Sequence, residues 1–440
     1  MKTLSPLGSP SLVSASKQRA RSRQLLGLSA IAGFVLAAAC SDDDSEPSNP
    51  GGGAGAAGAA GSAGEAGAAG SGGSGAGEGG AAGAAGAAGA AGAAGAAGAA
   101  GSSGQGDFDG VITVLNADAD GLQTPTTAAV RGNDLWVVNG QLTQLNGGTP
   151  NLPFNVVSVP LAGGPIGATA IELPGEDFFP EGIAATSDGT LFVGSITTGT
   201  ILRIQPDELE PDVIDFVDPD VAQRGVIGLT TDEDRLFLWF CDSSPNIPGG
   251  EIVGVDIDAS IERVRHLLPD PVVADVDAGA PPAQADAGDA GAGAPPPPPP
   301  ASFCNDLVVD RGGNLFATDS SGRVFRVDNE DLDVPNSAEV WLESPAITVP
   351  GGFGANGIDI VGDRMIIASG GTLVAVDPQS DNPASTVQVL SLGENGAAAT
   401  LCGPDGLQTV PGSDNEIVVI ENGFCPEARE RVVKVTLDLD

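Results

Sequence analysis

Four short segments of the chain begin with a side chain that offers oxygen to a metal ion. They are PEGIA, CNDLV, ANGID and PDGLQ, and their oxygen-bearing residues are Glu181, Asn305, Asn356 and Asp405. Two carboxylates and two amide carbonyls make an oxygen-only set, which suits Ca²⁺ rather than zinc or copper. If folding brings these residues together, they predict a calcium site.

Their spacing predicts the architecture that would bring them together. Starting from Glu181 and counting Ile227 as the next equivalent position, the steps to Asn305, Asn356 and Asp405 are 46, 78, 51 and 49 residues. The second step falls to 50 without the 28-residue stretch 274–301. Each repeat reads as a strand, a Gly/Asp turn and an apolar second strand, as in PEGIAATSDGTLFVGS. Six such repeats predict an all-β fold, a six-bladed β-propeller with four-stranded blades over residues 108–440.

The two ends of the folded region predict how the ring closes. The last repeat offers only GLQTV, EIVVI and RVVKVTL, whereas VITVL (111–115) lies alone before the first repeat. We expect this N-terminal strand to complete the last blade, which would remove open sheet edges. A seven-bladed ring is the alternative, but the sequence has no seventh repeat. The innermost strands of a propeller line its channel, so the four oxygen-bearing residues would converge there.

A second interpretation of the four residues stays open. Asn, Asp and Gly are common in the turns that connect strands, and they need no ligand there. For one position the turn is the better explanation. Four equivalent positions favour the metal site.

The first 107 residues do not resemble a folded domain. A basic segment precedes the apolar run LLGLSAIAGFVLAAA, and Cys40 follows directly. This order resembles a bacterial lipoprotein leader and implies a signal peptide over 1–39 and a lipid on Cys40, with an ordinary signal peptide as the alternative. The composition predicts a Gly/Ala-rich disordered tether over residues 40–107 and a disordered Pro/Ala/Asp-rich insertion over 274–301. We therefore expect a protein anchored by its lipid in the bacterial cell envelope.

Charge and cysteine content limit the partners and the chemistry. The chain has 58 Asp+Glu against 18 Lys+Arg, so it has no basic footprint for nucleic acid, and its charge favours a monomer. Four cysteines beyond Cys40 allow three pairings, of which the predicted loops favour Cys241–Cys304 and Cys402–Cys425. His266 is the only histidine, so a multi-histidine zinc site is excluded, and we expect it to be structural.

The four motifs resemble those of the gluconolactonase/regucalcin (senescence marker protein) family and, more distantly, diisopropylfluorophosphatase and paraoxonase. The resemblance implies that Glu181, Asn305, Asn356 and Asp405 bind calcium in the channel, with Asp405 also acting as general base on a small-molecule substrate. It implies hydrolysis of lactones or related esters. Two features depart from the family: a full repeat (about 125–173) precedes the glutamate, and Phe303 stands where an arginine is common. The second departure favours a more apolar substrate, or none.

Two functions from different classes therefore follow from the sequence. One is a tethered, calcium-dependent hydrolase. The other is a non-catalytic propeller lipoprotein that binds a ligand or protein partner, with calcium purely structural; a fold alone does not decide between them. Asp319 and Glu421, after the second strands of their repeats, are candidates for substrate contact or are solvated loop residues.

Overall fold

The computed structural model describes residues 108–439, apart from 118–120, 146, 169, 207, 215–223, 245–246, 271–300 and 351. The predicted signal peptide, Cys40 and the tether lie outside the described residues, and so does the 274–301 stretch except for Ala301. Within the described part, no helix is long and apolar enough to cross a membrane.

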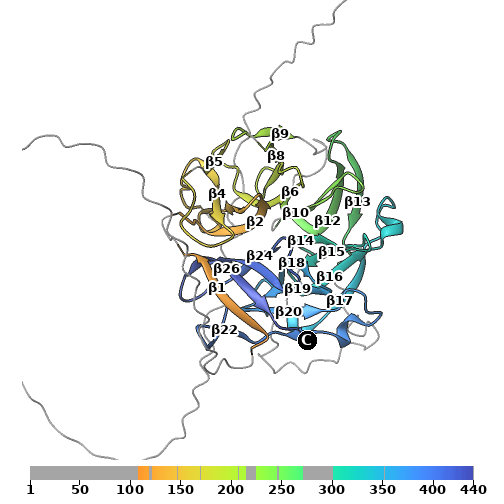
Figure 1. The fold of residues 1–440 in the computed structure, drawn as a ribbon. Coiled ribbons are helices and arrows are strands. Elements are labelled where there is room, and N and C mark those ends of the chain that lie inside the picture. Colours follow the sequence, from red (N-terminus) through yellow and green to blue (C-terminus); the bar gives the residue numbers. More distant parts are fainter. Residues whose placement is uncertain are drawn as a thin grey trace, which may run out of the picture. The chain divides into compact units, whose positions relative to one another are not determined.

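The strands form six antiparallel blades that follow one another in chain order around a ring (Figure 1). The first three blades are blade 1, with β2 (Pro125–Arg131), β3 (Asp134–Asn139), β4 (Phe154–Pro160) and β5 (Ala170–Leu173); blade 2, with β6 (Pro180–Ala185), β7 (Leu191–Ser195), β8 (Ile201–Ile204) and β9 (Asp212–Ile214); and blade 3, with β10 (Gly225–Asp232), β11 (Phe237–Ser244), β12 (Ile247–Asp256) and β13 (Glu262–Leu267). Blade 1 is thus the full repeat expected before Glu181.

Two further blades have the same plan. They are blade 4, with β14 (Cys304–Val309), β15 (Leu315–Asp319), β16 (Arg323–Val327) and β17 (Glu339–Glu343), and blade 5, with β18 (Ala355–Val361), β19 (Arg364–Ser369), β20 (Thr372–Val376) and β21 (Gln388–Val389). Short helices lie in the connections: α1 (Leu142–Leu145), η2 (Asn329–Asp331), η3 (Pro345–Ile347) and η4 (Pro383–Ser385). The prediction of a six-bladed propeller is confirmed.

Blade 6 joins the two ends of the folded region. Its strands β24 (Pro404–Thr409), β25 (Glu416–Asn422) and β26 (Glu430–Leu437) are followed in the sheet by β1 (Gly110–Asn116), as predicted. Figure 1 shows β1, in orange, beside β26, in blue. The sheet continues further than expected, because β1 also pairs in parallel with β22 (Leu392–Glu394), which pairs with β23 (Ala397–Ala399). β1 is therefore an interior strand, and its outer ladder groups are covered.

The core consists of six apolar layers, one between each pair of neighbouring blades. The layer between blades 3 and 4 includes Ile227, Trp239 and Leu307, and the layer that closes the ring between blades 6 and 1 includes Leu115 and Val418. Because both faces of a blade are covered, its second strand is mostly apolar, as in β7 (LFVGS), which is buried along its whole length. This packing fixes the rotation of every blade about the channel.

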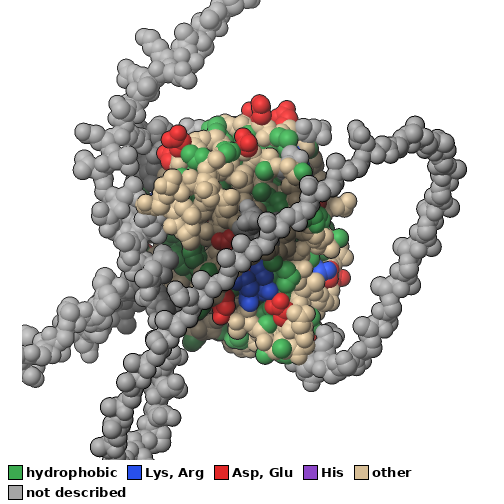
Figure 2. Space-filling view, turned by 90° about the vertical axis from the view of Figure 1, so that its left-hand side faces the viewer, with side chains coloured by type: hydrophobic (Ala, Val, Ile, Leu, Met, Phe, Trp, Pro, Cys, Tyr) green, Lys and Arg blue, Asp and Glu red, His purple; other side chains and the backbone are tan. Residues whose placement is uncertain are grey.

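The outer surface is of mixed character. Seen from one side of the propeller, a small group of basic side chains has acidic side chains on either side of it, and apolar and polar surface alternates elsewhere (Figure 2). This view shows no broad area of one charge.

Candidate metal centre

Each inner strand carries a β-bulge near its start. The pairing register with the second strand shifts between the residues of these six pairs: Pro125/Ala128, Pro180/Ile183, Val226/Leu229, Cys304/Leu307, Ala355/Ile358 and Pro404/Leu407. We call the first residue inside each bulge the head residue. In chain order the head residues are Thr126, Glu181, Ile227, Asn305, Asn356 and Asp405. The four predicted ligands therefore occupy one equivalent backbone position, in blades 2, 4, 5 and 6.

The inner strands pack against one another around the whole ring. Thr126 Oγ1 donates to the carbonyl oxygen of Glu181 at 2.6 Å, and Thr318 Oγ1 donates to that of Asn356 at 2.5 Å. In four of the six blades, the residue after the head residue is glycine. At Gly182, for example, a side chain would overlap the carbonyl oxygen of Ile227. The glycine that three of the four motifs share therefore permits the close approach of the inner strands.

The head residues are largely shielded from solvent. Glu181 and Asn305 are each 7% exposed and Asp405 is 6% exposed. Asn305 Nδ2 donates to Ser320 Oγ at 2.9 Å, and Asn356 Nδ2 donates to the carbonyl oxygen of Pro404 at 3.4 Å. Both amides thus bind the protein through nitrogen. Asn356 Oδ1 is buried and has no hydrogen-bond partner among the described residues, and such an atom is costly without a ligand.

Three carboxyl groups near the head residues resist ionisation. Burial, together with repulsion from Asp405 and Asp306, raises the pKa of Glu181 well above its usual range. Burial also raises the pKa of Asp405 to about 7, although the amides of Asn422 and Asn356 oppose this. Asp306 has its pKa raised to about 7 by burial, and repulsion from Asp359 and Asp405 adds to the effect. None of the three forms an ion pair with lysine or arginine in the described part of the chain, so a bound cation would favour their ionised forms.

Asp306 has a clear structural role. Its carboxylate accepts from the backbone N–H of Leu307 at 2.9 Å and of Ile358 at 3.2 Å, and so bridges blades 4 and 5. Since both of its oxygens accept hydrogen bonds, we leave it out of the ligand set.

The donor set fits calcium. Two carboxylates and two amide oxygens are hard ligands, and calcium takes six to eight oxygens, which leaves positions for water or substrate. The orphaned Asn356 Oδ1 and the uncompensated carboxylates are the features that a bound cation would satisfy.

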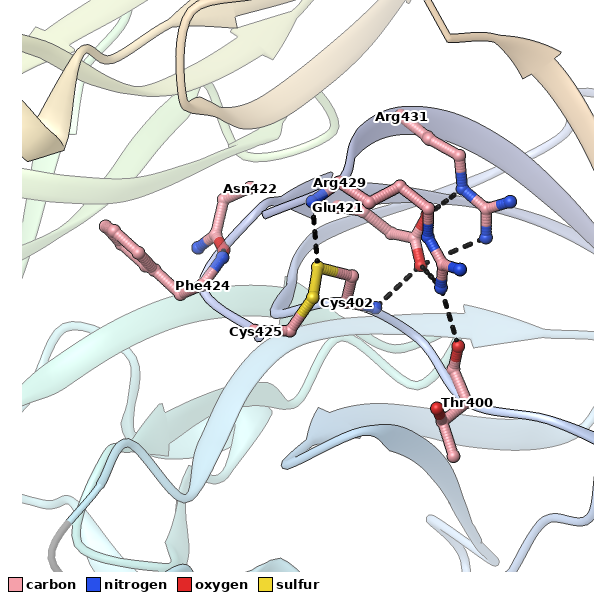
Figure 3. The surroundings of a disulfide bond; sticks show 8 residues. All are labelled: Thr400, Cys402, Glu421, Asn422, Phe424, Cys425, Arg429 and Arg431. Atoms are coloured by element: carbon pink, nitrogen blue, oxygen red, sulfur yellow. Dashed lines mark hydrogen bonds and ion pairs between the residues drawn. A yellow bond between two sulfur atoms is a disulfide. The ribbon is translucent and has the colours of Figure 1, made fainter. Parts of the chain in front are cut away.

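Asp319 and Glu421 do not face substrate. Both are completely buried, and each forms an ion pair with an arginine of the next strand, Arg323 and Arg431 respectively. Asp319 accepts from the backbone N–H of Phe303 at 3.0 Å, and Glu421 accepts from that of Cys402 at 2.6 Å, as Figure 3 shows for the latter. They fasten the segments that lead into β14 and β24, and both sequence interpretations of these residues, substrate contact and solvated loop, are wrong.

The structure also reveals two supports that the sequence analysis missed. Asn422 Nδ2 donates to Asp405 Oδ2 at 3.0 Å, and Ser320 receives the amide of Asn305. Ser320 directly follows the second strand of blade 4, and Asn422 is the last residue of the second strand of blade 6. In the sequence, these two residues could have been found by their shared position, directly after Asp319 and Glu421.

The predicted disulfides are present. Cys241–Cys304 joins blades 3 and 4, with Cα atoms 5.2 Å apart, and Cys402–Cys425 lies within blade 6, with Cα atoms 5.1 Å apart (Figure 3). His266 is structural, as expected: it is completely buried in β13, its Nε2 lies 3.2 Å from the carbonyl oxygen of Leu332, and burial lowers its pKa.

A cavity of about 820 Å³ lies away from the head residues. It sits between the outer strands of blades 1 and 2 and is lined by Leu152, Pro153, Ala170, Glu172, Leu173, Pro174, Gly175, Glu176, Leu209, Glu210 and Pro211. It contains none of the predicted site residues.

Comparisons with known proteins find similar chains at low sequence identity. The model for the N-terminal part of strictosidine synthase-like proteins matches residues 167–204, which include Glu181. No curated protein matches the sequence. Solved structures that resemble the chain include a luciferin-regenerating enzyme (13% identity, 74% of this chain and 95% of that chain, TM-score 0.49) and a virginiamycin B lyase from Staphylococcus aureus (14%, 76% and 100%, 0.44).

A provisionally assigned gluconolactonase is also similar, at 12% identity over 75% of this chain and 92% of that chain, with a TM-score of 0.46. At these identities and TM-scores the likeness carries no argument. The six-bladed fold that the resemblance to gluconolactonase-type propellers implies is the one that the strands of this chain form.

Proposed function

We propose that Glu181, Asn305, Asn356 and Asp405 bind one Ca²⁺, and that the protein is a calcium-dependent hydrolase of lactones or related esters. The observation that carries the proposal is the buried Asn356 Oδ1, which lacks a hydrogen-bond partner although the Asn356 side chain interacts with Asp405, and Asp405 in turn repels Glu181. A hard cation would satisfy all three groups at once.

The four residues would have different roles in catalysis. Glu181, Asn305 and Asn356 are ligands only. When bound, calcium polarises a carbonyl oxygen as a Lewis acid. Asp405 is both ligand and general base, because Asn422 holds its Oδ2 and restrains the direction in which the carboxylate takes up a proton.

We also propose that the protein acts at the bacterial cell envelope. A lipid on Cys40 and the Gly/Ala-rich segment would hold a monomeric propeller at the membrane of a bacterial cell envelope, at a distance set by the tether. A small molecule would reach the head residues from the medium, without nucleic acid as a partner.

The test combines metal binding with turnover. Calcium at a hundredfold excess over its dissociation constant should stabilise the full-length protein by about 3 kcal/mol, and Asp405→Ala should abolish both this response and hydrolysis of lactones. Asp381→Ala, an exposed acid on a distant loop, is the matched control and should keep both properties.

Two results would change the conclusion. A melting curve that does not respond to calcium or chelator would leave the four residues as turn formers. Calcium binding without turnover of any lactone or aryl ester would favour the non-catalytic propeller instead.

A further inference from the structure

Two phenylalanines stand out because they are exposed. Phe353 is 49% and Phe424 is 40% exposed, and in the described part of the chain no other phenylalanine is among the exposed large apolar residues. Phe353 lies just before β18, and Phe424 follows β25, whose end pairs with the start of β24. Both therefore lie on the face of the ring where the inner strands begin, which we call the head face.

Phe353 forms a pair with Phe303, which precedes β14. Their ring centroids are 6.4 Å apart in an edge-on arrangement. Ser320 joins this pair to the site: its N–H donates to the carbonyl oxygen of Phe303, its own carbonyl oxygen accepts from Gly354, and its Oγ accepts from Asn305. The aromatic pair is thus held directly beside a proposed ligand.

Phe424 is connected to another proposed ligand of the same site. Its N–H donates to Asn422 Oδ1 at 3.0 Å, and Asn422 in turn binds Asp405. Its neighbour Cys425 is fixed by the disulfide to Cys402. Figure 3 shows the ring of Phe424 on the side away from Arg429 and Arg431, so it does not pack on that network.

The aromatic residues lie in one sector of the ring. They belong to blades 4, 5 and 6, which also supply Asn305, Asn356 and Asp405. On the side of blade 2, the corresponding aromatic residues Phe178 and Phe179 are buried in the core. A scattered exposed apolar residue needs no explanation, whereas exposed rings that share hydrogen-bonded supports with two proposed ligands do.

We infer that Phe303, Phe353 and Phe424 form an aromatic wall that receives a flat apolar group of the substrate, so the protein selects lactones or esters with an aryl group over those without one. The inference rests on the proposed function, whose site supplies the reacting position. Rings of this kind gain both buried apolar area and edge-on contacts with a bound ring.

The test uses two lactones that differ only by a phenyl group, γ-phenyl-γ-butyrolactone and γ-butyrolactone. The calcium-loaded, full-length protein should show kcat/KM about tenfold or more higher for the phenyl compound. Phe353→Ala combined with Phe424→Ala should reduce that preference to about twofold or less. Val389→Ala, a similarly exposed residue on the outer strand β21 of blade 5, should leave it unchanged.

Binding is measured in parallel by saturation-transfer NMR. Binding of the phenyl lactone that needs the two phenylalanines, without turnover, would support the aromatic wall and overturn the hydrolase proposal. Turnover with equal rates for both lactones would overturn the aromatic wall and leave the hydrolase proposal standing. Neither binding nor turnover would overturn both.

Discussion

Blades 3 and 4 begin with the same backbone and with different side chains. Each has a bulge near the start of its inner strand, but the head residue is Ile227 in blade 3 and Asn305 in blade 4. Ile227 is 1% exposed and packs into the layer between the two blades. The backbone at this position therefore does not require Asn, Asp or Glu, and an apolar side chain can be accommodated there.

This difference weakens the view that the polar head residues only form turns. Burying a carboxylate or an amide without full hydrogen bonding is costly, whereas burying isoleucine is favourable. Four of the six blades nevertheless have the costly type. The comparison is therefore an argument for a ligand, and four predictions can break or sharpen it.

The largest expected effect concerns the disulfide that ties the two compared blades together. Replacing Cys241 and Cys304 by serine should lower the free energy of unfolding by about 4 kcal/mol, because the linked residues are 63 positions apart. The corresponding change at Cys402 and Cys425, 23 positions apart, should cost about 3 kcal/mol. Urea unfolding of both variants checks the order, and a larger loss for the second pair would contradict it.

The next prediction concerns a variant in which a polar head residue is replaced by isoleucine, the head residue of blade 3. Glu181→Ile should abolish the stabilisation by calcium, about 3 kcal/mol at a hundredfold excess, while calcium-free stability is kept or increased because a buried carboxyl is removed. Thermal melts with calcium and with chelator provide the measurement. Ile227→Val, which should cost about 1 kcal/mol and retain the calcium response, is the control. A calcium response that survives in Glu181→Ile would remove this residue from the site.

The pH dependence gives a third test. Because the pKa of Asp405 is raised to about 7 in the folded protein, the folded state binds more protons than the unfolded state between about pH 4 and pH 7. Calcium-free stability should therefore fall as the pH rises from 5 to 7.5, on the order of 2 kcal/mol for Asp405 alone. Calcium should stabilise more at pH 7.5 than at pH 5, since it needs ionised ligands.

Chemical denaturation at both pH values would measure this slope. Asp405→Asn should flatten it, because the amide does not titrate. An equal slope in wild type and variant would show that other groups cause the pH dependence.

The smallest effect is expected from Asn356→Asp. This variant keeps an oxygen where the orphaned Oδ1 lies, so stabilisation by calcium should change by no more than about 1 kcal/mol. Its calcium-free form should be less stable at pH 7.5 than the wild type, because a further negative charge joins Glu181 and Asp405. Isothermal titration with calcium measures the first effect, and loss of binding would show that the amide nitrogen is needed.

Much of the fold could be predicted from the sequence because the blades repeat. The fifty-residue period placed Glu181, Asn305, Asn356 and Asp405 at one equivalent position, and the count of strands in the last repeat identified β1 as its missing member. The cysteine pairs could be predicted for the same reason, since a repeat assigns each loop to a face of the ring.

The features that the sequence did not reveal are those outside the repeat. β22 and β23 lie between two blades; β22 pairs with β1 in parallel and β23 pairs with β22, contacts that no periodic pattern records. Asp319 and Glu421 look like loop residues, but an arginine four or ten positions later neutralises each of them in the interior. The aromatic wall depends on Ser320 and Asn422, whose roles follow only from hydrogen bonds across neighbouring strands.

The position of β1 has a consequence for the order of folding. Both of its partners, β22 and β26, lie at least 276 residues later in the chain, whereas blades 1 to 5 are each formed from neighbouring strands. Closing so long a loop has the highest entropic cost of any pairing in the ring, and such distant contacts form slowly. The first strand to be synthesised is therefore among the last to be paired, and the ring closes only after the end of the chain is available.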